Sequence, residues 1–245
     1  MASSPASSLS RSLLRSLAAL LAVLPFNACG QVLVGDGRIE TEVRELPAFN
    51  SISLSGSGEL RVHRGRQKVT VSVDSNILPY VRTAVSGGKL EIGLKPTVGV
   101  LKMGKLIVEV TMPGLEGLSV SGSGDAFVDR FEGDSFEGAI SGSGKLKADL
   151  SYRAVAFTIS GSGRIDLEGR TADAKLRVSG SGDIRAKDFA AEEAEVSISG
   201  SGGIEIRASR RLDVRVSGAG DLRYYGSPKI EQRISGSGKL RRIGD

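Results

Sequence analysis

The stretch Ile159-Ser160-Gly161-Ser162-Gly163-Arg164-Ile165 contains the pattern that decides the fold. Its tetrapeptide Ser-Gly-Ser-Gly occurs seven times in the chain, and an eighth copy has Ala in place of the second Ser. The copies begin at Ser55, Ser121, Ser141, Ser160, Ser179, Ser199, Ser217 and Ser235. From Ser121 onward the copies follow one another at a nearly constant spacing, and a repeat of this kind is typical of solenoid proteins.

Apolar residues recur at fixed offsets around the motif. They lie one and three positions before its first Ser, and five and seven positions after it; in the copy at Ser160 they are Ile159, Phe157, Ile165 and Leu167. All these offsets are odd, so the residues share one face of an extended chain. Stacking of equivalent positions in successive coils then gives continuous apolar rows. We therefore predict an all-β fold, a right-handed parallel β-helix with coils of about 19 residues.

The same alternation places both Gly residues of each motif inward and both Ser residues outward. An inward residue at a sharp corner has little room for a Cβ atom, which explains the Gly. A phosphate-binding loop is the alternative for a Gly-rich stretch. It would require Gly at position 139 and Ser or Thr at position 146 around Gly144-Lys145, where the chain has Ala139 and Leu146.

An Asp residue follows three of the motifs, at Asp125, Asp183 and Asp221, in a manner similar to calcium-binding repeats. Lys145 and Arg164 occupy the equivalent place in other copies and would repel a cation. We therefore predict no metal site, and the sequence indicates no other cofactor.

One outward row carries alternating charges, namely Lys147, Asp166, Arg185, Glu205 and Arg223. Stacked coils would place each charge beside its opposite, as exposed pairs worth less than ~1 kcal/mol each. A nucleic-acid groove would instead carry one sign of charge with aromatic residues between. Because the net charge is only +5, we predict no nucleic-acid partner.

The first part of the chain has the composition of an export signal. Basic Arg11 and Arg15 precede an apolar run over 17–26, which is too short to span a membrane as a helix. The single Cys follows it at Cys29, the position of a lipid-modified residue in bacterial lipoproteins. We predict a signal peptide over 1–28, cleavage before Cys29 and lipidation of Cys29, which would be the only attachment to a membrane. Ordinary cleavage after Gly30 and an uncleaved anchor are the alternatives.

Behind the signal, we expect a linker over 29–46, an N-terminal β region over 47–114 and the β-helix repeats over 115–245. Within the N-terminal region, the alternating runs at 69–73 and 106–110 predict strands, and this region is expected to cap the open end of the solenoid. At the other end, Lys239, Arg241 and Arg242 are expected to guard against edge-to-edge pairing.

Several segments resemble the putative autotransporter adhesin head domain family, also called the head GIN domain. They are Phe49 to Gly58, Asn76-Ile77-Leu78, Ser86 to Ile92, and the serial Ser-Gly-Ser-Gly copies, so the likeness covers about residues 47 to 240. The resemblance implies a β-helical protein of the bacterial envelope. The family has no assigned function, and no catalytic residues carry over from it.

The sequence favours a non-catalytic envelope module that binds or adheres, with an envelope or extracellular protein or glycan as partner. We expect it to be anchored at the outer membrane, and a periplasmic or secreted protein is the alternative. An envelope scaffold that assembles through its coil ends and a glycan-active β-helical enzyme are the alternatives. The enzyme has little support, because His63 is the only His and lies at an outward position. The aromatic pair Tyr224-Tyr225 is expected to pack in the coil rather than to form a ligand shelf.

Overall fold

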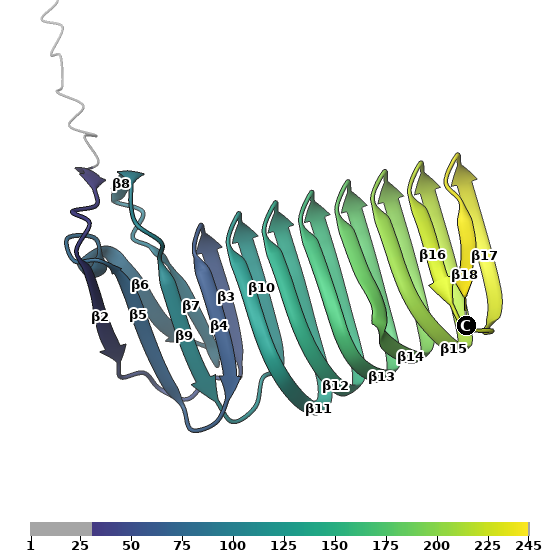
Figure 1. The fold of residues 1–245 in the computed structure, drawn as a ribbon, viewed down its shortest axis with the longest axis horizontal. Helices are drawn as coiled ribbons and strands as arrows, with labels where there is room; N and C mark the ends of the chain where they lie inside the picture. Colours follow the sequence, from purple (N-terminus) through teal and green to yellow (C-terminus); the bar gives the residue numbers. More distant parts are fainter. Residues whose placement is uncertain (1–30, 245) are drawn as a thin grey trace, which may run out of the picture. The chain divides into compact units, whose positions relative to one another are not determined.

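Parallel strands dominate the part of the chain that the computed structural model describes, residues 31–244 (Figure 1). The single helix within this range is the 3₁₀ turn η1 (Leu78–Tyr80). The strands are β1 (Gln31–Val34), β2 (Ile39–Arg44), β3 (Ser51–Gly56), β4 (Glu59–Arg64), β5 (Lys68–Asp74), β6 (Val81–Ser86), β7 (Lys89–Leu94), β8 (Val98–Lys102), β9 (Ile107–Met112), β10 (Gly117–Gly122), β11 (Asp125–Gly142), β12 (Lys145–Gly161), β13 (Arg164–Gly180), β14 (Asp183–Gly200), β15 (Gly203–Gly218), β16 (Asp221–Tyr225), β17 (Lys229–Gly236) and β18 (Leu240–Gly244).

The coils stack with the repeated motif in register. The five strands β11 to β15 have 16 to 18 residues each, pair in parallel with their neighbours and bend once along their length. Ser160 lies beside Ser141 on one side and Ser179 on the other. Figure 1 shows the resulting row of equivalent coils. The predicted parallel β-helix is confirmed, and each coil corresponds to one copy of the repeat.

The predicted apolar rows form the core. In the coil of β12 and β13, Phe157, Ile159, Ile165 and Leu167 are all buried. Burying a side chain of this size contributes roughly 1.5–3 kcal/mol before the loss of conformational entropy is counted. One row contains a small residue beside a large one, since a Cβ atom on Gly138 would overlap the ring of Phe157 in the next coil. The Phe157 ring therefore fills the space that Gly138 leaves.

The motif forms the corner at which one strand ends and the next begins. Gly161 has a φ of +125°, and a Cβ atom on it would lie 2.5 Å from the carbonyl oxygen of Gly142 in the preceding coil. At the second position, a Cβ atom on Gly163 would lie 2.6 Å from Cγ2 of Ile140. The prediction of inward Gly is confirmed for the second Gly of the motif, which is buried in the coils from Gly124 to Gly220. The first Gly, such as Gly161, is at least partly exposed, and its positive φ and the backbone of the preceding coil are what exclude a side chain there.

The N-terminal region continues the solenoid and then changes strand direction. β10 pairs with β3 and β11 pairs with β4, so β3 and β4 form a coil whose Ser55 lies beside Ser121. Beyond this coil, β5 pairs antiparallel with β9, and β6 pairs antiparallel with β7. The two strands predicted from alternation correspond to β5 and β9.

The structure differs from the linker expected over 29–46. β1 pairs in parallel with β8, and β2 pairs antiparallel with β5. The run Ile39-Glu40-Thr41-Glu42-Val43 alternates with the period of a strand, which is the signal that the linker expectation missed.

Charged side chains stand in line with the core rows at both ends of the solenoid. Glu40 and Glu42 on β2 lie opposite the buried Val73 and Val71. At the other end, Arg242 on β18 continues the row of Tyr224 and donates a hydrogen bond from Nε to the carbonyl of Gly226 at 2.8 Å. Charges at inward positions of an edge strand discourage further strand pairing. Both ends of the solenoid therefore carry charges that discourage pairing with a further strand.

Candidate functional site: the charged groove

A groove of about 510 Å³ lies on the side of the solenoid, across the coils of β12 to β16. We call it the charged groove. It is lined by Lys147, Asp166, Leu167, Glu168, Arg185, Lys187, Asp188, Glu205, Arg223 and Tyr225. The predicted row of alternating charges forms its floor, because consecutive members of that row are paired in register from β12 through β16.

The ion pairs of the groove differ from those that the row predicted. Lys147 Nζ lies 2.9 Å from Glu168 Oε1, and Glu168 lies two positions beyond Asp166, the register partner of Lys147. The hydrogen bond to Glu168 and the charge of that carboxylate raise the pKa of Lys147, and Asp166 contributes less. Neighbours in the row are thus of opposite charge, as predicted, but the contact that forms is diagonal.

Tyr225 closes one end of the charged groove. Its hydroxyl donates a hydrogen bond to Glu205 Oε1 at 2.7 Å, and this bond raises the pKa of Tyr225. The guanidinium carbon of Arg207 lies 5.2 Å from the centre of its ring. Tyr224, by contrast, packs partly buried against the core. The expectation of coil packing is confirmed for Tyr224, whereas Tyr225 lines the groove.

Two guanidinium groups of the groove are free for a ligand. Within residues 31–244, neither Arg185 nor Arg223 makes a side-chain hydrogen bond or an ion pair, although both are exposed. Within the same residues, the Asp166 carboxylate also makes no side-chain hydrogen bond or ion pair. Lys187 Nζ lies 3.9 Å from Asp188 Oδ2. The groove therefore offers two sets of unused planar donors, the geometry that recognises carboxylate and phosphate groups.

Two of the three Asp residues that follow the motif accept hydrogen bonds from backbone amides of the next coil. Asp183 Oδ1 accepts a hydrogen bond from the Gly203 amide at 3.1 Å, and Asp221 Oδ1 accepts one from the Lys239 amide at 3.0 Å. Each carboxylate thus ties its coil to the next. No group of three or more metal-ligating side chains occurs in the described part of the chain.

His63 lies on β4 as a partly exposed side chain, with Nδ1 2.5 Å from Asp129 Oδ2 of the next coil. The prediction that it is a surface residue is confirmed. Neither His63 nor Asp129 is among the residues that line the charged groove.

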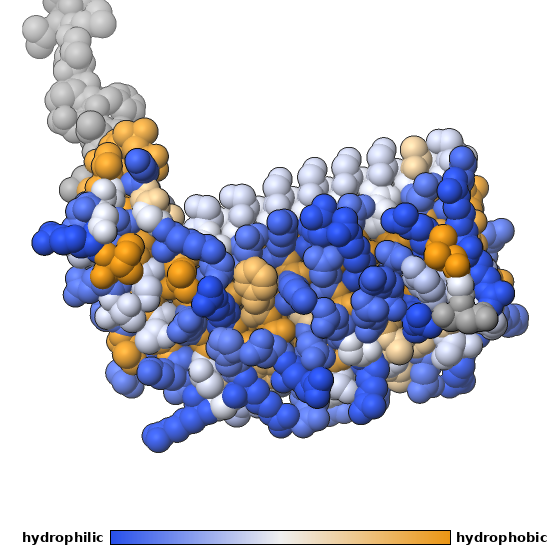
Figure 2. Space-filling model, viewed as in Figure 1, coloured by the Kyte–Doolittle hydropathy of each residue, from blue (hydrophilic) through white to orange (hydrophobic). Residues whose placement is uncertain are grey.

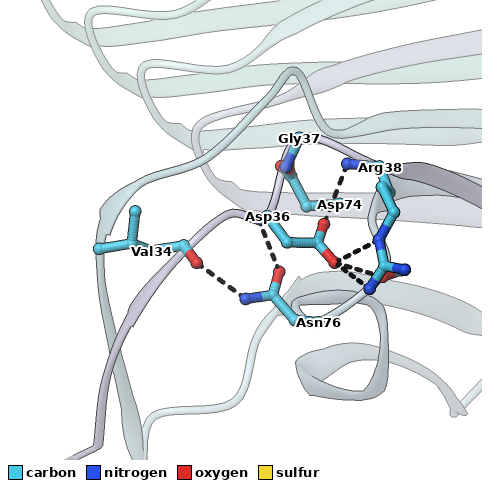
Figure 3. Close-up of polar contacts among 7 residues, drawn as sticks. Val34, Asp36, Gly37, Arg38, Asp74 and Asn76 are labelled. Carbon is cyan, nitrogen blue, oxygen red and sulfur yellow. Dashed lines mark hydrogen bonds and ion pairs between the residues drawn. The ribbon is translucent and has the colours of Figure 1, made fainter.

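The densest polar cluster lies in the N-terminal region (Figure 3). Asp74 is buried and accepts hydrogen bonds from the amides of Gly37, at 2.8 Å, and Gly104, at 2.5 Å. Asp36 binds the Ser75 hydroxyl at 2.6 Å and the Arg38 guanidinium at 3.2 Å, and the Ser75 bond is the main cause of its lowered pKa. These contacts join the loop between β1 and β2 to the turn after β5, so the cluster stabilises the fold of the N-terminal region.

Glu59 is a second buried carboxylate, and its partners are two basic side chains. It lies on β4 and binds both Lys105 and Arg61. The hydrogen bond from Lys105 is the largest cause of its lowered pKa. Paired and ionised in this way, Glu59 does not resemble a catalytic acid, which requires a raised pKa.

The lipidation residue predicted from the sequence, Cys29, and the whole predicted signal peptide lie outside the described residues. Within the described range, no helix has the length and apolarity needed to cross a membrane.

Solved structures with the same fold come from Bacteroides and Parabacteroides species. A protein titled a putative adhesin from Bacteroides fragilis is 25% identical, with a TM-score of 0.82 over 86% of this chain and 100% of that one. One titled a putative lipid binding protein from Parabacteroides distasonis is also 25% identical, with a TM-score of 0.72 over 87% of this chain and 100% of its own. A putative adhesin from Parabacteroides merdae, 23% identical with a TM-score of 0.72 over 87% of this chain and 99% of that one, shares the fold.

No curated protein matches the sequence. The family described as "putative auto-transporter adhesin, head GIN domain" matches residues 48–228, which include β3 to β16 and most of the solenoid. The chain therefore belongs to the putative auto-transporter adhesin head GIN domain family.

Proposed function

We propose that this protein is a non-catalytic, adhesin-like binding module of the bacterial envelope, and that the charged groove binds an acidic partner. The observation that carries the proposal is the pair of exposed guanidinium groups, Arg185 and Arg223, which lack a protein partner within residues 31–244. The family assignment and the related structures described as putative adhesins support the general role.

The arrangement of charges narrows the chemistry of the partner. Glu168 is held by Lys147, and Glu205 accepts the bond from Tyr225, so these two carboxylates are already engaged. The donors left over are those of Arg185 and Arg223, which suit carboxylate, sulfate or phosphate groups of an extracellular glycan or protein. Tyr225 adds an aromatic side chain beside them.

Binding of the purified full-length protein to arrays of acidic glycans and extracellular-matrix proteins tests the proposal. The double substitution Arg185→Gln, Arg223→Gln should weaken binding at least tenfold. Arg177→Gln is the matched control, since Arg177 is exposed and outside the groove. Loss of binding in the control as well as in the groove variant, or in neither, would contradict the role of the groove.

The coil-end scaffold is less well supported than binding. Inward charges at Glu40 and Glu42 on one end, and at Arg242 on the other, would have to be buried if copies stacked end to end. Size-exclusion chromatography with light scattering addresses this alternative, and we expect no concentration-dependent filament.

For the route to the envelope, we propose that Cys29 carries a lipid after the segment 1–28 is removed. The support is the placement of the single Cys directly behind the apolar run. Mass spectrometry of the membrane-extracted protein should find a diacylglyceryl group on Cys29. A mature chain beginning at Gln31 would reject lipidation and leave export intact.

A further inference from the structure

Strands β1 and β8 form a two-stranded ribbon apart from the main sheet, since within residues 31–244 neither strand pairs with any other. Residues 31–34 and 98–101 of this ribbon contain no charged side chain. Its exposed apolar side chains are Val32, Val34 and Leu101, and Leu101 is 77% exposed. We call these three side chains the ribbon patch. In Figure 2 apolar side chains gather over β1 and β8, whereas the visible side of the solenoid is mainly polar.

The ribbon differs from the other exposed edges of the fold. Those edges carry charges, such as Glu40 and Glu42 on β2 and Arg242 on β18. The ribbon has an open backbone edge on each side, and its one charged residue is Lys102 at the end of β8. Exposed apolar strands without charges are a liability in water, and such patches mark surfaces that contact another apolar phase or molecule.

The ribbon is fixed to the rest of the N-terminal region. Asp74 accepts hydrogen bonds from the amides of Gly37 and Gly104, which follow β1 and β8 respectively. Val100, the residue before Leu101, packs partly buried against the core. The ribbon patch is therefore the exposed side of an element whose other side is held by the fold.

The position of the ribbon in the chain indicates which apolar partner reaches it. β1 begins at Gln31, two residues after Cys29, the proposed site of the lipid. Two residues of extended chain span at most about 7 Å. The polar headgroup layer on each side of the hydrocarbon core of a bilayer is about 5–7 Å thick. A lipid on Cys29 would therefore hold the start of β1 close enough for neighbouring apolar side chains to reach the hydrocarbon.

The surroundings of the ribbon patch suit the boundary of a bilayer rather than its interior. Lys102 is exposed and makes no side-chain hydrogen bond or ion pair within residues 31–244, so its ammonium group is available to lipid phosphates. The nearby carboxylate of Asp36 is already bound to Ser75 and Arg38. The open backbone edges of the ribbon could not be satisfied inside hydrocarbon, which limits insertion to the side chains.

We propose that the ribbon patch inserts into the surface of the bilayer that carries the lipid anchor. This inference rests on the proposed lipidation of Cys29, and it adds a second attachment that holds the folded region against the membrane. The contact is separate from the charged groove, because none of the three patch residues lines that groove.

The chain contains no Trp, so a single introduced Trp reports on its own surroundings. Leu101→Trp and Val32→Trp place it in the ribbon patch. Phe127→Trp is the matched control, since Phe127 is an exposed aromatic residue on β11 in the solenoid. All three positions are exposed, so each variant should keep the Tm of the natural protein, and Val32→Trp provides a second position should Leu101→Trp fail to fold.

Each variant, expressed from the full-length sequence and extracted from membranes, is reconstituted into phosphatidylcholine vesicles with brominated or ordinary acyl chains. Bromine quenches Trp on contact. We expect brominated lipid to lower the fluorescence of the two patch variants at least twofold and to leave that of Phe127→Trp unchanged.

Mass spectrometry of the same samples reads the state of Cys29 separately. Lipidated protein without quenching at the patch would overturn this inference and leave the lipid anchor intact, whereas quenching without a lipid would reject the anchor and support the patch. Absence of both would reject both. Equal quenching in the control would also count against the patch. So would unquenched emission at short wavelength from Leu101→Trp, because another protein surface, such as a second copy, would then cover it.

Discussion

Each coil changes direction at the Ser-Gly corner and at the opposite bend, and the two places differ in how neighbouring coils align. At the corner the register is unbroken, and Gly142, Gly161, Gly180 and Gly200 follow one another without a shift. At the bend the register shifts in three of the four contacts between β11 and β15. The small differences in length between coils are therefore accommodated at the bend, while the corner stays constant.

The side chains at the two places show why. At the corner, the backbone of one coil touches that of the next, so no side chain fits. At the bend, an inward row consists of Phe131, Leu150, Gly169 and Phe189, which are neighbours in register. Gly169 resembles the corner glycines, because its φ is +111° and a Cβ atom on it would lie 2.1 Å from the carbonyl oxygen of Leu150. The corner thus has Gly in every coil, whereas the bend has Gly at this position in one of these four coils and a large side chain in the other three.

The largest effect is expected from Gly161→Val at the corner. Valine would require a strained positive φ and would bring its Cβ atom within 2.5 Å of the Gly142 carbonyl oxygen. We expect a loss of about 5 kcal/mol or more in the free energy of unfolding, measured by chemical denaturation. A loss below about 1 kcal/mol would show that the corner can relax.

A smaller loss is expected from Phe189→Ala at the bend. Phe189 is fully buried beside Gly169, and the substitution leaves a cavity. We expect a loss of about 3 kcal/mol, within the range for such changes. A loss as large as that of Gly161→Val, in the same denaturation experiment, would remove the contrast between corner and bend.

The ionisation of Tyr152 at alkaline pH tests the packing at the bend. Burial raises the pKa of Tyr152 to about 12, and its hydroxyl donates a hydrogen bond to the Leu115 carbonyl. The pKa of Tyr152 in the folded protein lies above the unfolded value of about 10. The stabilisation that the protonated phenol gives the folded state is therefore complete below pH 10, and it is lost as the pH rises toward 12.

The difference in unfolding free energy between the natural protein and Tyr152→Phe should therefore shrink or reverse across that window, by about 2 kcal/mol. Thermal melts at pH 8 and across this alkaline range measure it. A difference that stays constant with pH would show that the phenol is not protected.

The smallest effect is expected from Ser162→Ala on the outside of the corner. The Ser162 hydroxyl has no hydrogen-bond partner within residues 31–244, and Ala219 occupies the equivalent place in another coil. We expect a change below ~0.5 kcal/mol in the free energy of unfolding, as for surface substitutions in general. A loss comparable to that of Phe189→Ala would mean that the outward Ser residues of the motif stabilise the fold.

The sequence by itself determined the fold class, the coil length, the inward apolar rows and the buried second Gly of each motif. Alternation with period two and a serial Ser-Gly-Ser-Gly repeat leave few other solutions, because every coil must bury the same face against its neighbours. The charged row was also visible in the sequence, since each register partner occupies an equivalent place in its own repeat.

Only the tertiary structure decided which of those charges pair. Lys147 reaches Glu168 rather than Asp166, because long side chains select the nearest oxygen across the sheet and not the register partner. The strands β1 and β2 likewise depend on segments distant in the sequence, because they pair with β8 and β5 and belong to no repeat. The absence of side-chain partners at Arg185 and Arg223 within residues 31–244 was also decided by the tertiary structure, because contacts between coils form only when the chain is folded.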